Sequence, residues 1–181
     1  GTLFGSEILA ANHILLQITF LSAYALDGVA FSSEILVGEA IGQRKYQVFK
    51  KVVRSALKLG FIFSSVIGIS TYFLGFLVVD LMTSIKSVRL ICYEFIMWIS
   101  IMPIVSVFSY VYDGIFLGAA RGKEIRVAMI QSFAIFFICV TGLVPLIGNV
   151  GLWTSIVVFN GVRGLTLWTK LDRIQSSFSP Y

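Results

Sequence analysis

The sequence predicts an all-α membrane protein, built as a bundle of about five transmembrane helices. Hydrophobic residues make up 57% of the 181 residues and charged residues only 13%, whereas a soluble domain carries about 25% charged residues. The charges are also clustered, so that residues 59–79 and 127–162 contain none. Uncharged runs of this length suit helices that cross a bilayer, which need about 20 apolar residues, and lack the polar–apolar alternation of a membrane β-barrel.

The charge-free runs divide the chain, which we interpret as one transmembrane domain over residues 1–181, into five expected spans. The first and third spans are longer than a bilayer requires, so we expect them to tilt, kink or project beyond it. Pro103 predicts the position of a kink in the third span. The expected spans are residues 8–41, 56–79, 90–120, 127–144 and 151–169.

The uncharged block 127–162 has to contain a turn. As one straight helix it would be about 54 Å long, against a hydrocarbon core of about 30 Å. Pro145, Gly148 and Asn149 are turn-forming residues, because proline lacks a backbone N–H and glycine tolerates a positive φ. We therefore place the fourth span before these residues and the fifth after them.

Basic residues between the spans predict the orientation. The connection after the second span has only Lys86 and Arg89, and the connection after the fourth has no basic residue. Lys and Arg concentrate in cytoplasmic loops, so we expect a multi-pass protein of the cell (inner) membrane with its C-terminus in the cytoplasm and Gly1 outside. The expected cytoplasmic set is Arg44, Lys45, Lys50, Lys51, Arg54 and Lys58, then Arg121, Lys123 and Arg126, then Lys170 and Arg173.

These loops account for the net charge of +5 without any nucleic-acid partner. The chain begins with Gly on the predicted outer side, and residues 1–7 contain no signal peptide. We therefore expect that at least one further helix precedes these residues in a longer protein. A native start codon at or near residue 1 would contradict this expectation.

Three acidic residues are predicted to lie at membrane depth. Asp27 stands about 21 Å before the inner end of the first span, and Glu34 follows two helical turns later on the same face. Asp113 lies about 12 Å from the inner end of the third span. Charges at such depth cost about 2.5–3.5 kcal/mol and usually serve function. A buried carboxyl group can exchange a proton, or hold Na⁺ when it is ionised.

A purely structural interpretation of these acids is also open. Asp27 and Asp113 can pair with Arg163 or accept hydrogen bonds from Tyr or Ser, and Arg163 can either pair or extend to the inner interface. Glycines at four-residue spacing favour close helix packing over local unwinding. These are Gly38 and Gly42, and Gly114, Gly118 and Gly122.

Nothing in the sequence indicates an enzyme. His13 is the only histidine, and Cys92 and Cys139 predict neither a disulfide framework nor a zinc site. No Gly-rich loop leads into the Lys-Ser/Thr pair of a phosphate-binding loop. We expect no catalytic residue, no cofactor and no metal other than a possible Na⁺ at Asp113.

The longest motifs resemble the MATE (multidrug and toxic compound extrusion) transporters, and the similarity covers nearly all of residues 8–170. The Asp-Gly pair and the Glu before Leu-Val-Gly in the first span resemble the DinF-like branch. The similar segments are residues 8–17, 26–30 and 33–42 of the first span, 112–121 of the third, and 148–153 and 163–167 around the fifth.

The resemblance implies five of the six helices in the C-terminal lobe of a twelve-helix antiporter, whose N-terminal lobe and seventh helix lie outside this sequence. Such proteins export organic, cationic or amphipathic compounds in exchange for H⁺ or Na⁺. Asp113 matches an acid that faces the cavity of that lobe, and Asp27 and Glu34 match acids of the branch. With Tyr110, Asn12 and Gln17 they are the candidate substrate- or cation-binding residues, and Arg163 is the candidate ion-pair partner. Aromatic surface for a cation is expected from Phe20, Tyr24, Tyr110 and Tyr112.

Two alternatives remain. A flippase or exporter of lipid-linked sugars, from the related superfamily, would need more cavity arginines and lysines than Arg163. A non-transporting membrane scaffold would have no use for acids at membrane depth. The coupling ion and the substrate are left open by the sequence.

Overall fold

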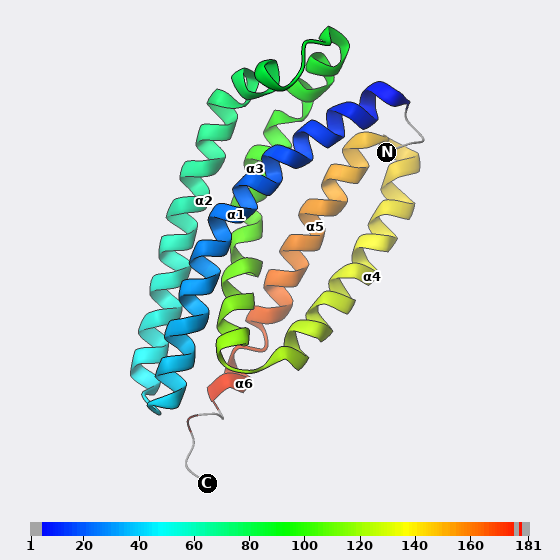
Figure 1. Cartoon of the computed structure of the whole chain (residues 1–181). Coiled ribbons are helices and arrows are strands. Elements are labelled where there is room, and N and C mark those ends of the chain that lie inside the picture. Colours follow the sequence, from blue (N-terminus) through cyan, green and yellow to red (C-terminus); the bar gives the residue numbers. More distant parts are fainter. Residues whose placement is uncertain (1–4, 176–177, 179–181) are drawn as a thin grey trace.

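The computed structural model describes residues 5–175 and residue 178, which form a bundle of long helices (Figure 1). Five of these helices are long and apolar enough to cross a membrane, and the described residues contain no β-strand. The all-α class and the number of spans are therefore confirmed, whereas Gly1 lies outside the described residues. The helices are α1 (Ser6–Gly42), α2 (Tyr46–Met82), α3 (Lys86–Gly118), α4 (Gly122–Ile147), α5 (Asn149–Trp168) and the short α6 (Asp172–Gln175).

The second helix begins at Tyr46 rather than near residue 56, so one predicted loop is wrong. Phe49, Val53 and Ala56 repeat at helical spacing and are buried in the core. Their burial extends the helix almost to the end of α1, and the basic side chains project from its exposed side. The basic residues that change from loop to helix are Lys50, Lys51 and Arg54.

The uncharged block 127–162 is divided within the predicted turn region. The turn between the two helices is a single residue. α4 continues through Pro145 to Ile147, and Gly148 alone separates it from α5, with φ 60° and ψ −134°. A side chain would strain this positive-φ backbone, so glycine is the residue that permits the reversal. Pro103 likewise lies inside α3, which continues past it as one helix.

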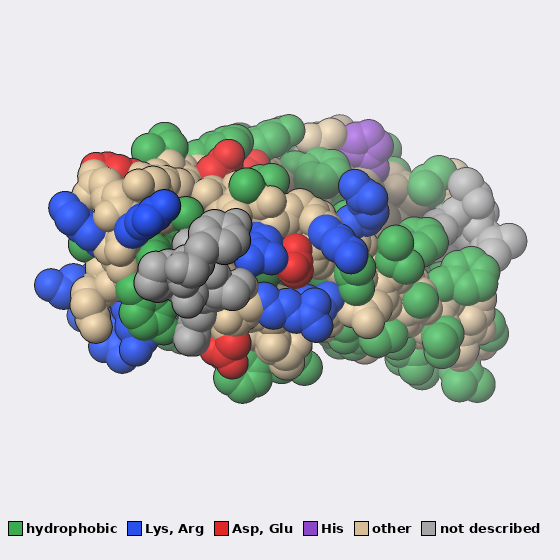
Figure 2. Space-filling model, turned by 90° about the horizontal axis from the view of Figure 1, so that it is seen from below, with side chains coloured by type: hydrophobic (Ala, Val, Ile, Leu, Met, Phe, Trp, Pro, Cys, Tyr) green, Lys and Arg blue, Asp and Glu red, His purple; other side chains and the backbone are tan. Residues whose placement is uncertain are grey.

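The two ends of the bundle differ in charge. The α1–α2 turn, the α3–α4 turn and α6 lie together at one end, called here the basic end (Figure 1). Figure 2 looks onto this end, where Lys and Arg side chains are spread over the surface. Of the basic residues, only Lys86 and Arg89 lie at the opposite end. Arg89 is engaged there, because it pairs with Asp80 at 3.2 Å and donates to the carbonyl oxygen of Thr83.

α3 is the central helix of the bundle. It packs against α1, α2 and α5, whereas α4 packs mainly against α5. Large hydrophobic side chains on the outer faces of α2 and α4 are exposed, as expected for helices whose outer faces meet hydrocarbon. The core of the bundle therefore lies along α3, whose residues lie between the neighbouring helices.

Glycines bring α3 and α1 into direct backbone contact. A Cβ at Gly114 would collide with the backbone of Ala30, and a Cβ at Gly118 with the backbone of Glu34. The packing interpretation is therefore confirmed for these two glycines. It is wrong for Gly42 and Gly122, because a Cβ at either would meet open space. The close approach places Asp113 of α3 beside the acidic stretch of α1.

Candidate functional site

Two neighbouring cavities lie between α1 and α5. Residues of α3 line the third side of both cavities, which we call the floor. The cavity nearer the basic end has a volume of about 270 Å³, and the other has a volume of about 240 Å³. Tyr110 and Arg163 line both cavities, so the two lie next to each other along one interface between α1 and α5. We call the two cavities together the α1–α5 groove.

The cavity nearer the basic end is called here the lower cavity, and the other is called the upper cavity. The lower cavity brings together four of the predicted site residues and the predicted ion-pair partner. Asp27 and Glu34 reach it from α1, Tyr110 and Asp113 from α3, and Arg163 from α5. If all four charged groups are ionised, three carboxylates oppose one guanidinium and the lower cavity carries a net charge of −2. Such a cavity attracts a cation.

Asp113 and Arg163 form the ion pair that the sequence left as one of two possibilities. Nη2 of Arg163 lies 2.5 Å from Oδ2 of Asp113, and the side chains are only 20% and 17% exposed. The pair joins the floor of the groove to its α5 wall. Arg163 therefore does not extend freely to the interface in this structure.

The same pair leaves hydrogen-bonding capacity unused. Oδ1 of Asp113 and Nε of Arg163 are buried and have no hydrogen-bond partner. A buried acceptor or donor without a partner costs about 1–3 kcal/mol. Both atoms belong to residues that line a cavity. A small polar ligand there, such as a water molecule or an ionic group, can donate to Oδ1 of Asp113 or accept from Nε of Arg163.

The upper cavity contains residues that the sequence analysis did not select. Asn160 lies one helical turn before Arg163, and its side-chain amide donates to the carbonyl oxygen of Ile156 at 3.1 Å. Thr19 and Ser106 add hydroxyl groups from α1 and α3. The spacing of three residues between Asn160 and Arg163 was the available signal, because it places both on one helix face.

One face of α1 carries polar and aromatic residues along most of its length. These side chains recur every three or four residues, and all of them are exposed or only half-buried. Polar groups on an exposed transmembrane face are unfavourable in hydrocarbon, so this face suits water or protein. It borders both cavities, and its members are His13, Gln17, Phe20, Tyr24, Asp27, Phe31 and Glu34.

Two predicted site residues do not enter the groove. Asn12 is buried and exchanges hydrogen bonds with Asn149 at 2.7 and 2.9 Å, and it also accepts one from Nε1 of Trp153 at 3.0 Å. Its amide is thus occupied in joining α1 to the start of α5. Gln17 is exposed on the polar face of α1 and lines neither cavity.

The predicted aromatic surface is only partly assembled. Phe20 lines the upper cavity and Tyr110 lines both. Tyr112 is buried in the core beside Ile115, and Tyr24 is exposed and lines neither cavity. Within the described residues, no three His, Cys, Asp or Glu side chains are grouped closely enough to hold a metal ion.

Comparison with known proteins agrees with this helical architecture. The MatE family model matches residues 1–143. The chain belongs to the MatE family. The DinF-like branch is confirmed as well, because this MatE chain is 34% identical over 167 residues to DNA damage-inducible protein F of Escherichia coli strain K12.

Further relatives give the extent of the match. Protein DETOXIFICATION 42 of Arabidopsis thaliana is 23% identical over 163 residues. This MatE chain spans about a third of the curated relatives' length, since the alignments cover 92% and 88% of it but 36% and 31% of those proteins. A structure described as the inward-facing conformation of a multidrug resistance MATE family transporter of the MOP superfamily matches with a TM-score of 0.74 and 20% identity, over 90% of this chain and 39% of the other.

Proposed function

We propose that this MatE chain forms part of a secondary antiporter that exports organic cations or amphipathic compounds in exchange for H⁺ or Na⁺. The observation that carries the proposal is the grouping around one cavity of Asp27, Glu34 and Asp113, three acids that the sequence predicts to lie at membrane depth. Three costly acids at one place are best explained by a cationic ligand. The printed description of the similar structure, a multidrug resistance transporter, supports the same class of substrate.

The exchange follows from charge balance in the α1–α5 groove. Arg163 neutralises Asp113, so the remaining negative charge of the lower cavity resides on Asp27 and Glu34. An organic cation neutralises these carboxylates when it is bound, and protons or Na⁺ neutralise them when it is not. The organic cation and the coupling ion, H⁺ or Na⁺, need the same carboxylates. Binding of one to these carboxylates therefore favours release of the other. Phe20 and Tyr110 offer aromatic faces to the organic cation.

The first test replaces Asp113 by Asn in the transporter that contains this chain. We expect coupled export to be lost while the protein still inserts into the membrane, and transport is compared for equal amounts of folded protein because this variant also breaks the ion pair with Arg163. The measurement is ion-driven efflux of a fluorescent cationic dye from proteoliposomes, with Glu94→Gln as control, because Glu94 is exposed and lines neither cavity. Full retained transport in the Asp113 variant would refute a role for this acid.

The chain is further proposed to supply the C-terminal lobe, with its C-terminus in the cytoplasm. Coverage of about a third of the relatives supports an additional lobe, and the charge difference between the ends supports the orientation. Reading the genomic sequence upstream of residue 1 tests the first point. Labelling cysteines placed at Lys123 and Lys86 with a membrane-impermeant reagent tests the second, and reaction of the cysteine at 123 from outside intact cells would contradict it.

The two alternatives are less well supported. Among the residues that the structure describes, Arg163 is the only basic one that lines the α1–α5 groove, so a lipid-linked sugar phosphate finds little complementary charge there. A scaffold subunit would not need the carboxylates. Unchanged cell physiology after simultaneous replacement of Asp27, Glu34 and Asp113 would favour the scaffold.

A further inference from the structure

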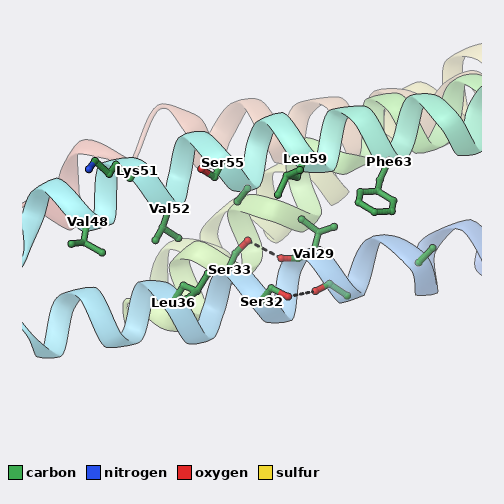
Figure 3. Close-up of a pocket in the computed structure, with 13 residues that line it drawn as sticks. Val29, Ser32, Ser33, Leu36, Val48, Lys51, Val52, Ser55, Leu59 and Phe63 are labelled. Carbon is green, nitrogen blue, oxygen red and sulfur yellow. Dashed lines mark hydrogen bonds between the residues drawn. The ribbon is translucent and has the colours of Figure 1, made fainter.

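The largest of the described cavities lies away from the candidate acids. It has a volume of about 550 Å³ and runs between the basic-end halves of α1 and α2 (Figure 3). We call it the α1–α2 groove. Its walls are Ala25, Gly28, Val29, Ser32, Ser33 and Leu36 from α1, and Val48, Lys51, Val52, Ser55, Ala56, Leu59 and Phe63 from α2.

The facing surfaces of α1 and α2 leave this groove open. Leu36, Val48, Leu59 and Phe63 all line it, yet they are between 40% and 56% exposed. A Cβ at Gly28 would meet nothing within 4 Å. The two helices therefore diverge enough to leave an apolar channel along their length, and in a membrane such a channel is filled by hydrocarbon.

The serines of the α1 wall do not make the groove polar. The hydroxyl of Ser32 donates to the carbonyl oxygen of Gly28 at 2.8 Å, and that of Ser33 donates to the carbonyl oxygen of Val29 at 2.7 Å (Figure 3). Each hydroxyl proton is thus used within its own helix. An acyl chain can lie against this wall without leaving a hydroxyl donor unsatisfied.

Positive charge lies at one end of the groove. Of the described residues that line it, Lys51 is the one that is charged, and Lys50, Arg54 and Lys58 are exposed on the same turns of α2. Glu39 is the first acidic residue of α1 after Leu36, the last α1 residue that lines the groove. Its side chain accepts a hydrogen bond from Gln43 and does not line the groove. An anionic group at this end therefore meets lysine and no opposing carboxylate in the groove wall.

The length of the α1–α2 groove agrees with the length of a lipid in one leaflet of a bilayer. Residues 48–63 of α2 advance by about 22 Å at 1.5 Å per residue. Half of a bilayer, including its headgroup region, is about 20–22 Å thick. A lipid that spans this stretch would have its phosphate beside Lys51 and its acyl chain extending toward Phe63, about 18 Å further along α2.

Two other outward-facing cavities provide an internal contrast. One lies between α1 and the far half of α2 and the other between α3 and α5, with volumes of about 400 and 500 Å³. None of the described residues that line these two cavities is charged. Apolar hollows thus occur in several places on this bundle, and of the three cavities, the α1–α2 groove is the one that combines a hollow with a lysine.

We propose that the α1–α2 groove binds an anionic phospholipid from the basic-end leaflet. One acyl chain lies along Leu36, Val52 and Leu59, and the phosphate lies beside Lys51. Each basic residue near an anionic membrane surface strengthens binding by about fivefold. Lys51 therefore gives the groove its preference for an anionic headgroup, and the apolar walls hold the chain.

The test measures how purified protein in detergent micelles retains added lipid, by native mass spectrometry. We expect phosphatidylglycerol to bind more tightly than phosphatidylcholine with the same chains. The Lys51→Gln variant should bind phosphatidylglycerol about fivefold more weakly and phosphatidylcholine as before. The Gly28→Leu variant, which fills the groove, should bind both less. Lys86→Gln, at the opposite end, is the matched control and should behave as the unmodified protein.

Several results would overturn the proposal. Equal binding of the two lipids, or an unchanged Lys51→Gln variant, would remove the role of charge. Displacement of phosphatidylglycerol by inorganic phosphate alone would indicate a phosphate site without an acyl groove. If the unmodified protein forms dimers in the same spectra, their loss in the Gly28→Leu variant with unchanged lipid binding would assign the groove to a second copy of the chain. Melting curves identify misfolded protein, and the surface variant Lys51→Gln keeps the test decisive if Gly28→Leu does not fold.

Discussion

Replacing either member of the Asp113–Arg163 pair should destabilise the bundle, and replacing both should restore much of the loss. The single variants are Asp113→Asn and Arg163→Gln, which keep size and polarity but each remove one charge. Removing one partner of a buried ion pair costs about 3–5 kcal/mol, because the other charge is left uncompensated. The pair is about one-fifth exposed, so we expect the lower end, about 3 kcal/mol for each single variant.

The assay is thermal unfolding of purified protein, followed by a thiol-reactive dye or by retention in size-exclusion chromatography. For a chain of this size, 1 kcal/mol corresponds to about 2–4 °C, so each single variant should melt about 6–12 °C lower. The double variant should melt well above the temperature expected from adding the two losses, because it buries no unpaired charge. Glu94→Gln, on an exposed acid, should change stability by less than about 0.5 kcal/mol.

The result that would refute this reasoning is strict additivity. If the double variant loses as much as the two single variants together, the groups do not stabilise each other across α3 and α5. The 2.5 Å contact would then be energetically neutral, as exposed ion pairs often are. The transport proposal would still stand in that case, because it depends on the carboxylates facing the cavity.

Substitutions at two further sites, Gly114 and Asn12, test the packing that positions the groove, with Gly122 as a control position. Gly114→Val should prevent folding or cost more than about 4 kcal/mol, because its side chain would collide with the backbone of Ala30, whereas Gly122→Ala should be tolerated in the same expression and melting assays. Asn12→Ala should lower stability by about 2–3 kcal/mol, since it leaves the amide of Asn149 buried without a partner; an Asn12 variant of normal stability but impaired transport would instead favour the site role that the sequence analysis assigned to it.

Some local features were predicted wrongly from the sequence for identifiable physical reasons. The basic stretch after α1 reads as a loop because its charges are dense, but Phe49 and Val53 use only one face of a helix and leave the rest for lysine and arginine. Asn12 is predicted to be a binding residue because it lies in the segment of the first span that resembles the family. Its partners lie 137 and 141 residues away in the chain, and no pattern within α1 indicates them.

By itself, the sequence determined the all-α class, the five helices and the clustering of basic residues toward one end of the bundle. Those properties are local, because a helix in hydrocarbon must pair its own backbone groups and keep its charges near its ends. Which acids share a cavity was decided by tertiary structure alone. Asp113 meets Asp27 because glycines let two backbones touch, and it meets Arg163 because α5 turns that face toward α3. Such contacts depend on the relative placement of three helices, and the sequence of each helix taken singly does not specify it.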